Sequence, residues 1–178
     1  MTSAPAEDPV VVLRPAVAAD VPLLELWDED PDVAESGGDD DVFDWAWEVP
    51  RSVDWREILV AEAEGEAVGV VVLIDAAREE THYWGDDVEP GAWAIDIWIG
   101  EERHRSRGVG RQMMESALRR CFGSHAAPAV LIDPLTTNVR AIRFYERMGF
   151  VHVGPRRFGE DDCSVMRITP GALAPGGR

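Results

Sequence analysis

One segment of this sequence restricts the possible folds more than any other. Residues 92–99 (AWAIDIWI) predict a buried strand that carries a single carboxylate, Asp96. A turn containing two glycines follows (residues 103–111, RHRSRGVGR), and residues 108–122 then have apolar side chains at helical spacing. A strand that leads through a turn into a helix is typical of β-α-β crossovers, so we expect a sheet with at least one parallel pair.

The rest of the pattern combines this crossover with hairpins. Apolar residues 58–62 and 67–74 flank the turn sequence AEGE and predict a β-hairpin. The order of elements predicts the α/β (α+β) class, with a mixed sheet flanked by helices. Further strands are predicted at residues 10–13, 130–132, 150–153 and 164–168, and helices from residue 21, where Asp20 is the expected cap, and over 138–148.

The 178 residues are enough for one domain, which we place at 10–169 between flexible tails at 1–9 and 170–178. Residues 28–44 are predicted as an acidic mobile loop or frayed helix, and residues 75–91 as a second acidic loop. We find no apolar stretch long enough for a transmembrane helix and no signal peptide. With only two cysteines, Cys121 and Cys163, no disulfide framework is expected, and these features together predict a cytoplasmic protein.

Charge is distributed unevenly along the chain. The sequence has 34 acidic and 17 basic residues, all of the latter Arg, and a net charge of −17, which argues against nucleic-acid binding. The first 100 residues carry a net charge of −22 and the remaining 78 carry +5. This asymmetry suggests a polycationic partner for the first part and a phosphorylated anion for the second, although genome composition and solubility also favour an acidic chain.

The turn at 103–111 has the features of a pyrophosphate site. Gly108 and Gly110 allow main-chain amides to approach a ligand, and the start of the helix supplies free N–H groups. The long phosphate loop requires a Lys, which this chain lacks. Four guanidinium groups surround the glycines, those of Arg103, Arg105, Arg107 and Arg111.

A second segment with chemical potential begins at Asp133 and leads into a helix. Asn138 is positioned to cap this helix, and Ala141, Tyr145 and Met148 share one of its faces. A Tyr in such a position is more often a core aromatic than a general acid, so both readings remain open.

Together these segments resemble the GCN5-related N-acetyltransferase (GNAT) family. Residues 105–110 (RSRGVG) resemble its acetyl-CoA signature, Q/R-x-x-G-x-G/A. Residues 138–150 (NVRAIRFYERMGF) resemble its second signature, N-x-x-A-x-x-x-Y-E-x-x-G-F. The resemblance implies acetyl-CoA as donor and a mixed sheet of about six to seven strands with about four helices, splayed between the fourth and fifth strands.

A narrower resemblance is to the aminoglycoside 6′-N-acetyltransferases. Residues 83–96 (YWGDDVEPGAWAID) and 133–143 (DPLTTNVRAIR) are similar to segments of these enzymes, whereas residues 34–38 lack their aromatic pair before Gly-Gly. This implies acetylation of the 6′-amine of an aminoglycoside, giving resistance, by a monomer or homodimer. The alternatives are acetylation of another amine, such as a siderophore-type lysine derivative or a polyamine, and acyl-CoA binding without catalysis.

The resemblance also implies roles for single residues. Asp96 binds the amine and acts as its base, unless it is a structural carboxylate, and Tyr145 protonates the departing thiolate. Asp133 is the second acceptor carboxylate or a turn former. Further predicted acceptor contacts are Glu80, Trp84, Asp86 and Asp87, with Trp84 offering a flat or cation–π surface. The predicted acetyl-CoA contacts are Ile97, Trp98 and Ile99 through their main chain, Arg103, Arg105, Ser106, Arg107, Gly108, Val109, Gly110, Arg111, Asn138, Ala141, Phe144 and Tyr145. No metal-ligand spacing is found.

Overall fold

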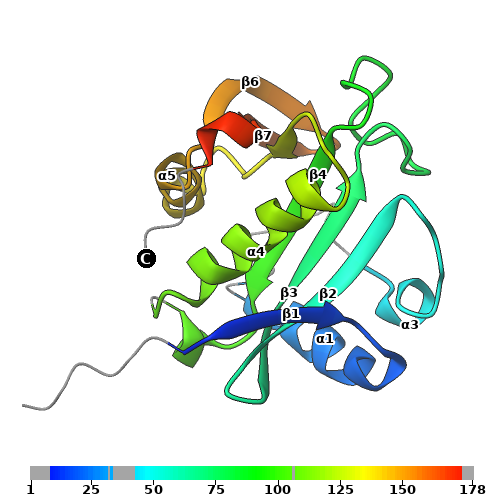
Figure 1. The fold of residues 1–178 in the computed structure, drawn as a ribbon, viewed down its shortest axis with the longest axis vertical. Helices are drawn as coiled ribbons and strands as arrows, with labels where there is room; N and C mark the ends of the chain where they lie inside the picture. The colour runs from blue at the N-terminus through cyan, green and yellow to red at the C-terminus, as the bar shows by residue number, and fades with distance from the viewer. Residues whose placement is uncertain (1–8, 32, 34–42, 106, 174–178) are drawn as a thin grey trace, which may run out of the picture.

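The computed structural model describes residues 9–31, 33, 43–105 and 107–173. They form one seven-stranded mixed sheet in the order β1-β2-β3-β4-β5-β7-β6 (Figure 1). The predicted fold class is confirmed. The strands are β1 (Val11–Pro15), β2 (Arg56–Ala63), β3 (Glu66–Asp75), β4 (Trp93–Ile99), β5 (Val130–Ile132), β6 (Val151–Phe158) and β7 (Asp161–Ile168). The described α-helices are α1 (Val21–Asp28), α3 (Trp45–Glu48), α4 (Val109–Gly123) and α5 (Val139–Arg147).

Strands β1 to β4 form an antiparallel meander, and the predicted hairpin joins β2 to β3. Its two turn residues, Glu64 and Gly65, have φ of 54° and 83°. Positive φ at both positions suits a tight two-residue turn, whose twist matches that of the flanking strands. The AEGE sequence thus sets the register in which β2 and β3 pair.

The crossover after β4 brings β5 alongside it in parallel, as the strand–turn–helix pattern predicted. Only two residue pairs join these strands, Trp93 with Val130 and Ala94 with Leu131. β4 continues to Ile99, whereas β5 ends at Ile132. The sheet is therefore splayed between β4 and β5, and the opening lies beyond Ala94 and Leu131.

The two faces of the sheet have separate cores. Helix α4 crosses in front of the sheet in Figure 1 and buries Met113, Met114 and Leu118 against it, and α5 packs on the same cluster. The opposite face is covered by α1 and α3, through Trp27 and Trp45 among others. Alternating side chains of β4 contribute to both cores, so each face has its own chemistry around one shared opening.

The ends of the chain differ from the sequence predictions. The segment predicted as a turn after residue 153 is part of a long hairpin, β6 and β7, whose turn is Gly159–Glu160. Pro155 is tolerated because β6 lies at the edge of the sheet. The predicted C-terminal tail is wrong over its first residues: Pro170–Ala172 form a 3-10 helix, and Leu173 packs on the main core.

Asp20 does not cap α1 as predicted. Its carboxylate accepts hydrogen bonds from Arg14, at 2.7 and 2.8 Å, and from the Val17 N–H. These contacts close the 3-10 turn Ala18–Asp20 and lower the pKa of Asp20, mainly through Arg14. Within the described ranges, none of the helices combines the length and the apolarity that crossing a membrane requires.

Candidate active site

Two carboxylates border the opening between β4 and β5. Asp96 lies on β4 two residues beyond Ala94, and Asp133 lies two residues beyond Leu131, just after β5, so both follow the last paired residues of these strands. The side chains of Ala94 and Leu131 lie in one buried cluster on the face of the sheet away from α4. Side chains two residues apart on a strand point to the same face, so Asp96 and Asp133 also project on that face. The structure thus brings together the two residues that were predicted separately as acceptor carboxylates.

Main-chain N–H groups of β4 also face the opening. The Trp93 N–H donates to the carbonyl of Ala129, just before β5, at 3.1 Å. N–H directions alternate along a strand, so those of Ile97 and Ile99 point to the same side as that of Trp93. At the level of Ile97 and Ile99, β5 no longer pairs with β4. These N–H groups are placed to donate to a carbonyl oxygen lodged between the strands.

Trp98, predicted to act only through its main chain, also contributes a side chain on the Asp96 face. Its indole ring lies 5.8 Å from that of Trp45 and 6.1 Å from the ring of Phe43, measured between centroids. The indole Nε1 is buried and has no hydrogen-bond partner among the described residues. Asp96 therefore has an aromatic wall on the side toward α1 and α3.

On the other side of the opening, Asp133 is held by a residue 50 positions away. The hydroxyl of Tyr83 donates a hydrogen bond to Asp133 Oδ2 at 2.6 Å. Burial raises the pKa of Asp133, against the opposing effects of the Tyr83 hydrogen bond and the positive charge of Arg156. Asp133 is thus more than a turn former, since its carboxyl is fixed in a desolvated position at the opening.

The start of α4 has the geometry expected for an anion site. Gly108 precedes the helix with φ of 76°, a left-handed conformation that favours glycine. The N-cap residue of α4, Gly108, has no side chain to offer the first N–H groups of the helix, in contrast to Asn138 of α5. A Cβ at Gly110 would only come within 3.5 Å of Ile99 Cδ1, an ordinary contact, so packing alone does not require glycine there. Ser106 lies outside the described residues.

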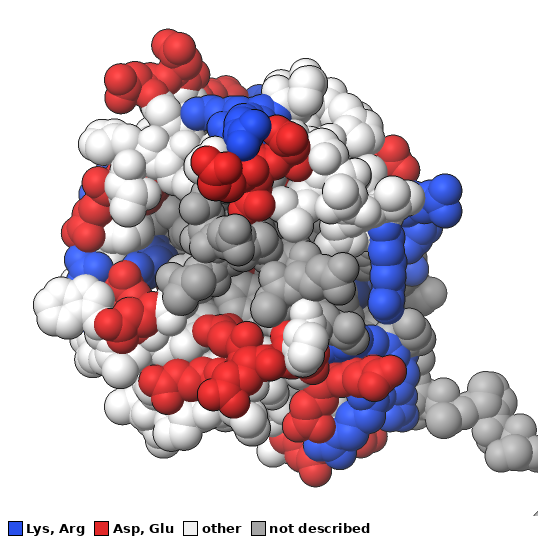
Figure 2. Space-filling model, turned by 180° about the vertical axis from the view of Figure 1, so that it is seen from behind, with Lys and Arg blue, Asp and Glu red and all other residues white. Residues whose placement is uncertain are grey.

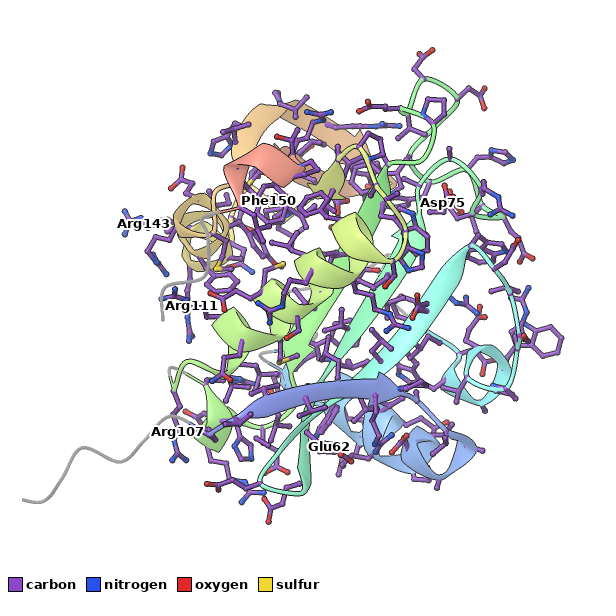
Figure 3. All side chains as sticks on the ribbon, in the orientation of Figure 1. Glu62, Asp75, Arg107, Arg111, Arg143 and Phe150 are labelled. Carbon is purple, nitrogen blue, oxygen red and sulfur yellow. The ribbon has the colours of Figure 1, made fainter. Side chains whose placement is uncertain are left out.

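Three of the four predicted phosphate-binding arginines are also paired with carboxylates. The fourth, Arg107, is exposed. Figure 3 shows Arg107 and Arg111 near the start of α4, and Arg143 of α5 on the same side of the molecule. The pairs are Arg103 with Glu101 and Glu66, at 2.6 and 3.2 Å, Arg105 with Asp30 at 3.2 Å, and Arg111 with Glu115 at 2.8 Å.

The residues predicted on α5 lie on the α4 side of the sheet. Asn138 caps the helix as predicted, since its side chain accepts a hydrogen bond from the Ala141 N–H at 3.1 Å. Tyr145 packs on the main core with Phe144, and their ring centroids are 5.3 Å apart. Asp96 and Tyr145, predicted as base and acid, thus approach the opening from opposite faces of the sheet.

The acidic loop after β3 gives a mixed outcome. The prediction that Trp84 offers an exposed face is wrong: the residue is 5% exposed and packs edge-on against Phe158, because the loop folds back on the C-terminal hairpin. Glu80 accepts two hydrogen bonds from Arg51, which offsets its charge. Asp86 and Asp87 are exposed. The face opposite α4 displays several groups of acidic side chains (Figure 2).

Sequence reasoning did not assign a role to Tyr83 or Glu79. Glu79 is buried and accepts hydrogen bonds from the N–H groups of Thr81 and Tyr83, which shapes the loop. The two adjacent aromatic residues at 83–84 are the signal in the sequence that could have drawn attention to Tyr83. No local pattern, however, links Tyr83 to Asp133. Within the described ranges, no group of three or more His, Cys, Asp or Glu side chains is arranged to hold a metal ion.

Comparison with known proteins establishes the family. The model of the acetyltransferase (GNAT) domain matches residues 16–158, most of the chain. The protein therefore belongs to the GNAT acetyltransferase family, as the two signatures indicated.

The individual proteins that match this chain share low sequence identity with it. An aminoglycoside N(6')-acetyltransferase type 1 from Klebsiella pneumoniae is 26% identical over 95 residues, which cover 53% of this chain and 47% of the relative. A spermine/spermidine N(1)-acetyltransferase from Bacillus subtilis is 22% identical over 85 residues, 48% of this chain and 56% of the relative. The chain thus matches only about half the length of these curated relatives.

Among solved structures, aminoglycoside acetyltransferase AAC(6')-Ib in complex with coenzyme A and kanamycin superposes with a TM-score of 0.80 at 23% identity. The match covers 91% of this chain and 96% of that one. A spermidine N-acetyltransferase SpeG chimera from Vibrio cholerae and hSSAT gives a TM-score of 0.67 at 17% identity, over 90% of this chain and 95% of that one. At these identities the likeness concerns the fold.

Proposed function

We propose that this protein transfers the acetyl group of acetyl-CoA to the 6′-amine of an aminoglycoside and thereby inactivates the antibiotic. The observation that carries the proposal is the pair of carboxylates, Asp96 and Asp133, on one side of an opening whose other side adjoins the uncapped start of α4. Carboxylates suit a substrate with several ammonium groups, and helix N–H groups suit the CoA phosphates. The relatives named for aminoglycoside acetylation support this assignment.

In the proposed reaction, Asp96 binds the acceptor ammonium and removes its proton, directly or through a water molecule. The amine nitrogen then attacks the thioester carbon, while the Ile97 and Ile99 N–H groups stabilise the negative charge on the carbonyl oxygen. The C–N bond forms and the C–S bond breaks. Tyr145 donates its proton to the departing thiolate, and the second proton lost by the nitrogen restores the Tyr145 hydroxyl, so the products are an amide and free CoA.

A polyamine is the second candidate acceptor. The acidic face suits any polycation, and the relatives include spermine/spermidine N(1)-acetyltransferase. We favour an aminoglycoside because residues 83–96 and 133–143 carry the pattern of the 6′-N-acetyltransferases. Since acetyl-CoA is a metabolite of the cell interior, we place the reaction in the cytoplasm.

The experiment that tests this function measures thiol release from acetyl-CoA by the purified protein. Kanamycin, tobramycin, spermidine and lysine derivatives are compared as acceptors at low and high salt. We expect rapid release with the antibiotics, and a kcat/KM that falls as salt screens the acidic face. Release with spermidine alone would establish the polyamine alternative. Binding of acetyl-CoA without release to any acceptor would indicate a non-catalytic module.

Tyr145→Phe tests the proposed general acid. The ring keeps its packing with Phe144 and Phe150, so we expect a normal Tm. Loss of a positioned acid lowers kcat about 10²–10⁴-fold, which the same assay measures. Full turnover by this variant would leave Tyr145 as a core residue only.

A further inference from the structure

We propose that Tyr83 is a positioning residue for the acceptor: its hydroxyl orients the Asp133 carboxylate to receive a second ammonium group while Asp96 holds the reacting amine. This inference rests on the proposed function for the amine class of the acceptor. It assigns a role to a residue that makes no direct contribution to the chemical step.

The first support is the way in which Asp133 is held. Tyr83 donates to Oδ2 at 2.6 Å, and it is the one side chain among the described residues with a recorded hydrogen bond to this carboxylate. A phenol is a neutral donor, so it fixes the direction of the carboxylate without offsetting its charge. Glu80 is the contrast, because Arg51 both holds and neutralises it. Among the described residues Asp133 forms no ion pair, and Arg156 acts on it only as a nearby positive charge.

The second support is the rigidity of the Tyr83 ring. The ring stacks on Phe158 with centroids 4.3 Å apart and an interplanar angle of 6°. Arg156 lies over Phe158 at 4.6 Å and donates to the Trp84 carbonyl at 2.7 Å, which fixes the other side of the stack. The Tyr83 N–H is held by the buried Glu79. The hydroxyl cannot leave Asp133 without disturbing these contacts.

The third support is the position of Asp133 relative to Asp96. The two acids lie beyond the last paired residues of β4 and β5, on the same face of the sheet. An acceptor with two amines is therefore able to place one amine at Asp96 and the other at Asp133. The titratable or charged side chains that act on Asp133 are Tyr83 from the loop and Arg156 from β6.

Tyr83→Phe is the decisive variant, because it removes the hydroxyl and keeps the ring on Phe158. Loss of a hydrogen bond to a charged group predicts a KM for kanamycin about 10-fold or more above wild type. The KM for acetyl-CoA and the Tm stay unchanged. The acidic limb of the kcat/KM profile moves to higher pH, since the phenol that lowers the pKa of Asp133 is gone. Ser124→Ala, which removes an exposed hydroxyl at the far end of α4, is the control and stays within about 2-fold.

Asp133→Asn completes a double-mutant cycle. If Tyr83 acts through Asp133, adding Tyr83→Phe to Asp133→Asn produces no further rise in KM. A second 10-fold rise, or an unchanged KM in Tyr83→Phe alone, overturns the inference. Calorimetric binding of kanamycin gives a readout that needs no turnover. If wild type neither binds nor acetylates kanamycin, both proposals fail; if it does both and Tyr83→Phe changes neither, only the role of Tyr83 fails.

Discussion

The two faces of the sheet meet at one opening but differ in how they are built. On the α4 face, a continuous apolar core runs beneath α4 and α5, and Arg107 and Arg111 are exposed near the start of α4. On the opposite face, Asp96 and Asp133 lie partly buried beside aromatic side chains. Under the proposed function, this single break in strand pairing gives two substrates of opposite charge access to one point from opposite sides.

The two faces also hold their charged groups differently. Arg103, Arg105 and Arg111 are each paired with a carboxylate, so an arriving phosphate has to compete for them. The uncapped N–H groups of α4 have no such competitor among the side chains of the described residues. Asp133, by contrast, is oriented by a neutral phenol. We therefore expect the helix start to dominate cofactor binding and the carboxylates to dominate acceptor binding.

The largest expected effect is on the acceptor face. Asp96→Asn removes the proposed base and its charge, and we expect kcat/KM for kanamycin to fall about 10²–10⁴-fold. Calorimetry should show unchanged acetyl-CoA binding, since Asp96 lies on the other face. Asp162→Asn makes the same chemical change at an exposed residue of β7, and a similar loss there would contradict a specific role for Asp96.

A smaller effect is expected on the α4 face. Gly108→Ala places a Cβ at φ of 76°, which costs about 1–2 kcal/mol and lowers the Tm by a few degrees. We expect a higher KM for acetyl-CoA and an unchanged KM for kanamycin. Gly123→Ala is the matched control at the other end of α4, where a Cβ meets nothing within 4 Å. If Gly108→Ala and Gly123→Ala raised the KM for acetyl-CoA equally, the start of α4 would have no special role in cofactor binding.

The smallest effect concerns stability and its pH dependence. The pKa of Asp133 is higher in the folded protein than in the unfolded chain. At pH values above the ordinary Asp pKa, the folded protein therefore binds more protons at this residue than the unfolded chain does. The ionised residue therefore destabilises the fold, and this cost disappears as the pH falls through the raised pKa. Asp133→Asn should increase the Tm at neutral pH and make no difference at low pH, as thermal unfolding across the pH range can measure. A lower Tm at neutral pH would contradict this account.

Several features of the fold were predictable because they depend on neighbours in sequence. Residues 92–99 form a buried strand, AEGE forms a tight turn and Asn138 caps α5, each decided within about ten residues. The wrong predictions depended on distant partners. Trp84 looked like a loop residue available to a ligand, but Phe158 buries it. Asp20 had the position of a helix cap, but Arg14 engages its carboxylate.

The sequence by itself determined the family, the strand that carries Asp96 and the glycine that begins α4, because these follow from local pattern and backbone preference. Only the tertiary structure decided that Asp96 and Asp133 lie at the same opening and that Tyr83 donates a hydrogen bond to Asp133. The register of β4 with β5 and the stacking of Tyr83 on Phe158 join segments far apart in the chain. Such contacts are set by packing of the whole sheet, which no short segment encodes.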